Sequence, residues 1–160
     1  MIPVTDILDK AKPYIVGWIR GYIQASARVY NTTPLTLTTG VTTTLPYSTV
    51  SWDNNSMWNA GNNTRLTAQT AGVYAITGYA SFAANATGRR VLGVYINGSG
   101  SPITNNGVAA CGGGSTMDVQ VLAIYQLNQN DYVELKATQD SGGNLNVQYQ
   151  TLLLHRLSGF

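Results

Sequence analysis

From residue 72 to the end, the chain is divided into short apolar runs of strand length that are separated by turn residues. The runs cover residues 72–85, 90–96, 107–111, 118–127, 132–138 and 145–157. No segment between them has the periodicity of a helix. Chains with this spacing form antiparallel sandwiches or barrels, because each strand buries one face against an opposing sheet. We therefore predict an all-β antiparallel sandwich.

The composition supports the same fold class. Thr and Asn account for 19 and 14 of the 160 residues, whereas charged residues make up only 10%. Thr favours strands and Asn favours turns, and both are poor helix formers. The pair Asn97-Gly98 is typical of a tight hairpin. These features argue against a helical bundle and against an alternating β/α enzyme fold.

Charge and reactive side chains exclude several functions. The net charge is +2, and only Arg89 and Arg90 are adjacent cations, so we expect no nucleic-acid binding. The single cysteine, Cys111, cannot form an internal disulfide or a thiol-based zinc site. With one histidine, His155, imidazole-based catalysis or metal binding is not expected either. We predict no bound metal and no cofactor.

The chain also carries no recognisable membrane or export signal. The most apolar window, residues 14–23, is about half as long as a bilayer span requires. An acidic residue comes early, and no small-residue cleavage site follows an apolar run. We expect no membrane span, and synthesis in the cytoplasm without a signal peptide.

Residues 1–28 differ from the rest of the chain. Apolar or small residues recur with heptad spacing at Val4, Leu8, Ala11, Ile15, Trp18, Tyr22 and Ala25. Proline suits the first turn of a helix, so we predict a short helix from Pro13. A helix this short needs a partner surface: copies of itself, another protein, or its own domain. We assign residues 1–28 as an anchor or oligomerisation segment through Ile15, Trp18, Ile19 and Tyr22, residues 29–44 as a linker, and residues 45–160 as the head.

Two strand runs are apolar on both faces. In residues 118–127, Val119, Val121, Ala123 and Tyr125 alternate with Leu122 and Ile124. In the last run, Leu145, Val147, Tyr149, Leu153 and Leu157 share one face, and Leu152 and Leu154 fall on the other. A strand with one solvent-exposed face does not carry apolar residues on both faces in this way. We predict that another copy of the chain covers the outer face of one sheet.

Several short motifs occur in a specific order between residues 45 and 158. They are Ala71-Gly72-Val73-Tyr74 opening a long strand to Phe82, Asn85-Ala86-Thr87-Gly88-Arg89-Arg90, Asn97-Gly98, Asp131-Tyr132-Val133-Glu134 after Leu127, and Gln139-Asp140-Ser141-Gly142-Gly143. This pattern resembles the jelly-roll head shared by the complement first-component globular domain and tumour necrosis factor. It is most similar to the bacteriophage versions at the ends of tail fibres and spikes.

The resemblance implies a ten-stranded jelly roll that forms a homotrimer about a threefold axis, preceded here by the short helix. On this basis we assign the trimer interface to Val121, Ala123, Tyr125, Tyr149 and Leu153. The family contains no conventional enzymes, and some heads hold calcium near the axis. After Asp53 this chain has only Asp118, Asp131, Glu134 and Asp140 as acidic residues, which argues against a calcium cage.

Three functions compete at this stage. The first is a virion-surface head that binds a host glycan or surface protein through apical loops or inter-protomer grooves, with residues 1–28 attached to a virion protein. Candidate ligand contacts are Trp52, Trp58, Asn85, Thr87, Arg89, Asn105, Asn106 and Asp140. The second is a non-catalytic capsid or tail decoration protein without a host ligand. The third, a polysaccharide hydrolase using a pair such as Asp53 with Asp118, is disfavoured because carboxylates are scarce.

Overall fold

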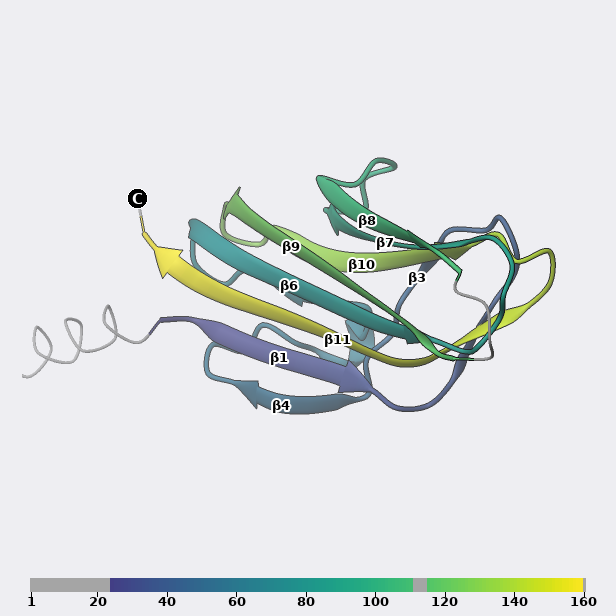
Figure 1. The fold of residues 1–160 in the computed structure, drawn as a ribbon. Coiled ribbons are helices and arrows are strands. Elements are labelled where there is room, and N and C mark those ends of the chain that lie inside the picture. Colours follow the sequence, from purple (N-terminus) through teal and green to yellow (C-terminus); the bar gives the residue numbers. More distant parts are fainter. Residues whose placement is uncertain (1–23, 111–114, 160) are drawn as a thin grey trace, which may run out of the picture.

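The computed structural model describes residues 24–110 and 115–159, and these residues form two antiparallel sheets packed face to face (Figure 1). The six-stranded sheet has the order β4-β1-β11-β6-β9, with β2 paired to β11; the five-stranded sheet has the order β3-β10-β7-β8, with β5 paired to β10. A 3-10 turn, η1 (Ala60–Asn62), joins them. The bounds are β1 Ser26–Asn31, β2 Leu35–Leu37, β3 Thr43–Thr44, β4 Thr49–Asp53, β5 Arg65–Thr67, β6 Gly72–Phe82, β7 Arg89–Ile96, β8 Thr104–Ala109, β9 Met117–Leu127, β10 Tyr132–Gln139 and β11 Leu145–Ser158.

The predicted all-β antiparallel sandwich is confirmed. Each of the six strand runs expected after residue 72 corresponds to one strand from β6 to β11. The described residues contain 11 strand segments rather than ten, because the chain before residue 72 supplies several short ones. Asn97-Gly98 forms a tight turn, with both residues at positive φ and the Ser99 amide donating to the Ile96 carbonyl at 3.0 Å. The tight hairpin itself is not formed, because residues 97–103 separate β7 from β8.

Residues 29–44 do not form the expected linker. β1 pairs with β11 along its whole length, β2 pairs with the start of β11, and β3 pairs with β10. Val29 and Leu37 are fully buried. The Thr-rich composition of this region reflects short strands at the sandwich margin, where one face is wet and Thr is well tolerated. The domain therefore begins before residue 29.

The core lies between the two sheets and follows the predicted alternation. On β6, Tyr74, Ile76 and Phe82 are fully buried, and on β10 Val133, Leu135 and Ala137 face them. Such alternation places one face of each strand in the core and the other outside. The sheets approach closely at Gly78 of β6, where an added Cβ would lie 2.6 Å from a Leu135 methyl carbon.

The predicted faces of β11 were wrong for Leu145 and Val147, because the strand contains a bulge. Val147 pairs with Phe82 and Tyr149 pairs with Ser81, so one extra residue is inserted in β11. Before the bulge Leu145 and Val147 face the core; after it the core positions are Leu152 and Leu154. Tyr149 and Leu153 consequently lie on the outer face of the six-stranded sheet.

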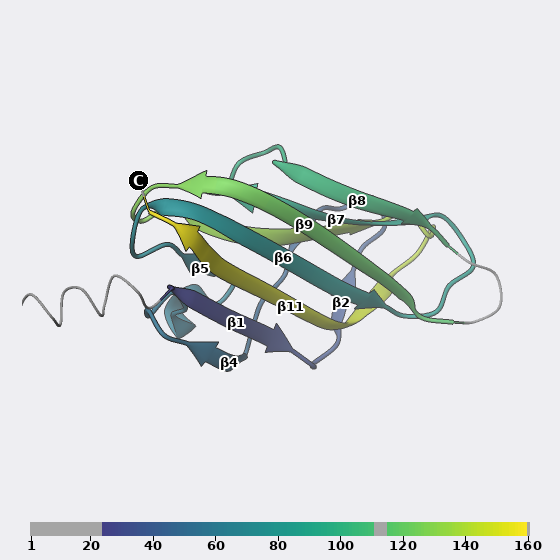
Figure 2. The same ribbon diagram turned by 60° about the vertical axis from the view of Figure 1, so that its left-hand side comes forward.

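The two ends of the sandwich differ in what they carry. The first residues of β1 and the last residues of β11 lie together at one end, and the loops after β6 and β10 lie at the other (Figures 1 and 2). The anchor residues Ile15, Trp18, Ile19 and Tyr22, with the predicted N-terminal helix and Cys111, lie outside the described residues. Within the described ranges, no helix has the length and apolar character needed to cross a bilayer.

Candidate functional site

Four of the predicted ligand contacts come together at the end of the sandwich away from residue 24. Asp140 accepts a hydrogen bond from the backbone amide of Arg89, and its other oxygen lies 3.5 Å from Arg89 Nε. Asn85 Oδ1 accepts from the Thr87 amide at 2.8 Å. Gly88 has φ +74°, and any Cβ there would collide with Asp140. The structure thus brings four of the eight predicted ligand contacts together at this end.

Their interactions are directed mainly at the fold. The fully buried Arg90 donates to the carbonyl oxygens of Thr87 at 2.8 Å and Asn85 at 3.0 Å. The backbone amide of Arg89, assisted by the Arg89 charge, lowers the pKa of Asp140. An ionised carboxylate and a buried guanidinium therefore hold the 85–90 loop in one shape.

Asn105 and Asn106 lie on the edge strand β8 and are exposed. Asn106 Nδ2 donates to the Gln120 carbonyl of β9 at 2.9 Å, which links the two sheets. This contact ties the edge of one sheet to the edge of the other. The two asparagines pair with Gly93 and Leu92 of β7, so they lie further along the sheet than the 85–90 loop.

The two predicted tryptophans lie on either side of the end of β4: Trp52 is within the strand, and Trp58 is in the segment that follows it. Trp52 is 43% exposed on the outer face of the six-stranded sheet, and its Nε1 donates to Ser26 Oγ at 3.0 Å. The Arg28 guanidinium lies 5.8 Å from the Trp52 ring centroid. Trp58 is half-buried and packs against the core. Trp52 and Trp58 therefore belong to different surfaces.

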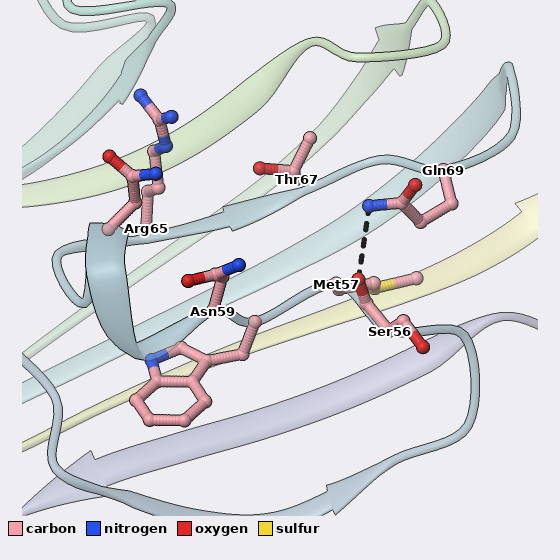
Figure 3. Close-up of a pocket in the computed structure, with 8 residues that line it drawn as sticks. Ser56, Met57, Asn59, Arg65, Thr67 and Gln69 are labelled. Atoms are coloured by element: carbon pink, nitrogen blue, oxygen red, sulfur yellow. Dashed lines mark hydrogen bonds between the residues drawn. The ribbon is translucent and has the colours of Figure 1, made fainter.

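Trp58 lines a cavity of about 280 Å³, which we call the 56–69 pocket (Figure 3). The chain from the end of β4 to β5 crosses the open side of the sandwich here, because β4 and β5 belong to different sheets. In Figure 3, Arg65 lies at one end of the pocket, Gln69 and Ser56 at the other, with Asn59 between them. The lining residues are Ser56, Met57, Trp58, Asn59, Asn62, Arg65, Thr67 and Gln69.

A single carboxylate organises the floor of this pocket. Asp53 Oδ1 accepts from the amides of Asn55 at 3.1 Å and Met57 at 3.0 Å, and Oδ2 accepts from Trp58 at 2.9 Å. This wrapping is possible because Ser56 adopts φ 52°. Asp53, considered in the sequence as a catalytic carboxylate, therefore has a structural role in the loop.

The outer face of the six-stranded sheet carries a second candidate surface. Exposed large apolar side chains lie on this face at Leu122 and Ile124 of β9 and Trp52 of β4, and Leu157 is exposed near the end of β11. Val50 and Tyr125 are also exposed, but they pair with the core residues Val29 and Tyr74 and therefore belong to the inner face. Cross-strand pairing aligns Trp52, Arg28, Leu153, Thr77 and Leu122 in one row. The row runs across the sheet from the β4 edge to the β9 edge.

The interface prediction for β9 needs correction. Val121 is 4% exposed and contributes to the core, and Ala123 is half-buried against it, so neither side chain is available to another copy. Tyr125 is 40% exposed, but it pairs with the buried Tyr74 and so belongs to the inner face as well. The outward positions are Leu122 and Ile124, which are 66% and 67% exposed. The sequence held the signal, since Asp118, Gln120 and Gln126 share the parity of Leu122 and Ile124 and mark the outer face.

Tyr149 and Leu153 do lie outward, as the interface prediction requires. Tyr149 packs against Tyr30 and Tyr79, with ring centroids 6.2 and 5.7 Å apart. Arg28 donates to the Tyr149 hydroxyl at 3.2 Å, and these groups border a shallow hollow of about 360 Å³. Burial, followed by a hydrogen bond to Asp118, raises the pKa of Tyr79. The centre of the face is thus polar and aromatic between two apolar edges.

No group of three or more His, Cys, Asp or Glu side chains among the described residues is placed to hold a metal ion.

Comparisons with known proteins identify the fold. No protein-family model matches the sequence, and no curated protein matches it. The globular domain of zebrafish complement 1qA protein superposes with a TM-score of 0.60 and 16% identity, over 83% of this chain and 96% of that domain. Eiger TNF from S. frugiperda superposes with a TM-score of 0.64 and 10% identity, over 86% of this chain and 94% of that one.

This chain has the jelly-roll fold of the complement head and of TNF. The likeness at these identities shows the fold alone. The jelly roll implied by the sequence resemblance is confirmed, while the trimer, the bacteriophage version and the ligand stay predictions.

Proposed function

We propose that this chain is the head of a homotrimeric virion fibre or spike that binds a host-surface glycan or protein without catalysing a reaction. The observation that carries the proposal is the gathering of exposed large apolar side chains on one sheet face. A monomeric protein rarely leaves such a face open, and apolar patches of this kind are sites of association.

The arrangement of the face favours a ring of copies. Leu122 and Ile124 lie on the β9 edge strand, and Trp52 lies on β4 at the opposite edge. Two different patches on one face suit a head-to-tail contact, in which the β9 edge of one copy covers the centre of the next. Such contacts generate closed rings when the rotation closes. The resemblance to the complement and TNF heads supports three copies in the ring.

The assignment to a virion rests on two features of the sequence. They are the bacteriophage-type motifs between residues 45 and 158 and the heptad spacing of apolar residues in residues 1–28, which predicts contact with a partner. In this proposal residues 1–28 attach the head to a virion protein, and the head is displayed on the virion surface. Three linked sites then raise the effective concentration of each, so that weak individual binding becomes firm attachment.

The test combines a mass measurement with a competition assay. Light scattering should give a mass of three times 17.1 kDa. The purified full chain, added to host cells before the virus, should bind the cells and reduce adsorption. A trimer that leaves adsorption unchanged would contradict receptor binding and favour a decoration protein, which should then bind virus particles. A chain that stays monomeric at all concentrations would contradict the proposed homotrimer.

A further inference from the structure

We infer that the 56–69 pocket binds one acidic monosaccharide unit, such as a uronic acid of a surface glycan. The inference rests on the proposed binding function and names its ligand. It is carried by the rigidity, the lining chemistry and the single charged lining residue of the pocket.

The pocket has its shape before any ligand arrives. The Asp53 carboxylate fixes the backbone from Asn55 to Trp58 through three hydrogen bonds. The Thr67 amide donates to the Met57 carbonyl at 2.8 Å, and Gln69 Nε2 donates to the Ser56 carbonyl at 3.0 Å (Figure 3). A preformed site of this kind avoids the ordering cost that weakens binding to a mobile loop.

The lining suits a hydroxylated ring. Asn59, Asn62 and Gln69 provide amides, and Ser56 and Thr67 provide hydroxyls. These groups both donate and accept, as is required to satisfy sugar hydroxyls, and the Trp58 indole adds an aromatic surface. The volume of about 280 Å³ lies just below the usual range of about 300–1,000 Å³ for ligand pockets, so the site accommodates one ring rather than a chain.

The charge of the pocket makes that ligand acidic. No carboxylate lines it, and Arg65 is its only charged lining residue. The nearest strand partner, Glu134 of β10, is engaged elsewhere, because its oxygens lie 3.4 Å from the Thr64 hydroxyl and 4.0 Å from Lys136 Nζ. Arg65 instead stacks on the Tyr132 ring at 4.2 Å, which leaves its charge without an anionic partner in the described part of the chain. Guanidinium groups bind carboxylates strongly.

Titration of the full chain with sodium glucuronate and with glucose, followed by NMR or calorimetry, tests the inference. Glucuronate should bind and shift resonances of residues 56–69, and glucose should bind more weakly. Arg65→Gln should weaken glucuronate binding about tenfold or more, the loss expected for one charge-assisted hydrogen bond, and Arg65→Lys should restore part of it. Arg89→Gln, a cation at the other end of the sandwich, is the matched control and should have no effect.

Thermal unfolding of each variant separates a lost contact from a lost fold, and Thr67→Val offers a second, nearly isosteric change in the pocket that should also weaken binding. Absence of glucuronate binding, equal binding of glucose, or binding that survives Arg65→Gln would each overturn the inference. The proposed function fails differently. If the chain blocks adsorption but does not bind glucuronate, the proposed function stands and the inferred ligand is wrong. If the chain binds glucuronate but does not affect adsorption, the inferred pocket ligand stands and the receptor-binding role is wrong.

Discussion

Replacing Leu122 and Ile124 with Asp should dissociate the proposed trimer and leave the protomer folded. The two side chains are 66% and 67% exposed, and both point away from the sandwich core. A charge at either position therefore has no buried neighbour to disturb within one protomer. In the assembly it would be forced into an apolar contact, where an unpaired carboxylate is costly.

The size of the effect follows from the exposed area. Full burial of a Leu or Ile side chain is worth about 1.5–3 kcal/mol, so the two thirds exposed here contribute about 1–2 kcal/mol each on association. A trimer contains six such side chains, which gives about 6–12 kcal/mol for the assembly. Since 1.4 kcal/mol is a factor of ten, losing even the lower value weakens assembly by about 10⁴-fold.

Light scattering over a range of protein concentrations measures this directly, and the melting temperature of an oligomer should depend on concentration where that of a monomer does not. Leu122→Thr with Ile124→Thr removes most of the apolar area but keeps strand preference, and it should weaken assembly less than the Asp pair. Val41→Asp is the control, because Val41 is 49% exposed but lies outside this sheet. A double Asp variant that stays assembled at the concentration of the original chain would refute the reasoning.

Two further substitutions test the fold around the sites. Gly78→Ala should lower the free energy of unfolding by about 1–3 kcal/mol through overpacking against Leu135. Gly100→Ala is the control, because an added Cβ there meets nothing within 4 Å. Denaturant unfolding measures both variants, and equal losses of stability would contradict the close approach at Gly78. Asp140→Asn should be less stable than the original chain near neutral pH. The Arg89 amide and charge lower the pKa of Asp140, so its carboxylate stabilises the fold above the pKa of the unfolded chain and loses this contribution as pH falls through the lower folded-state pKa. The two stability curves should converge in acid, and a constant gap would argue against it.

Much of the sandwich was predictable because period-two alternation is a local signal. Residues 132–138 alternate cleanly, and β10 buries Val133, Leu135 and Ala137 as expected. The same holds for Tyr74 and Ile76 of β6. Pairing with a distant strand does not change which residues share a face, so the sequence alone was sufficient for these strands.

The sequence was insufficient where one extra residue changes the parity. The bulge after Val147 reverses the faces of β11, and no local feature of the sequence distinguishes it from a regular strand. The strands β1 to β3 were missed for another reason. They are short and Thr-rich, and what places them in sheets is pairing with β10 and β11 more than 90 residues away.

The 56–69 pocket shows the same division between local and distant signals. Trp58 was recognised from its aromatic type and its amide neighbours. Arg65 was missed, because its place at the pocket depends on how the chain returns from β4 to β5 across the open side of the sandwich. The set of residues that lines the pocket is a property of packing, and a sequence does not report packing.

The positions of the two surfaces determine how their effects can be separated. The 56–69 pocket begins where β4 ends, and Leu122 and Ile124 lie on β9 at the opposite edge of the same sheet. Substitutions on β9 therefore leave the pocket lining untouched. If the proposed function and its ligand are both correct, the dissociated variant must retain the affinity of the original chain for a free monosaccharide while losing attachment to cells. That combination follows from multivalency, because linkage raises attachment without changing any single contact. A loss of both would instead mean that a neighbouring copy completes the pocket.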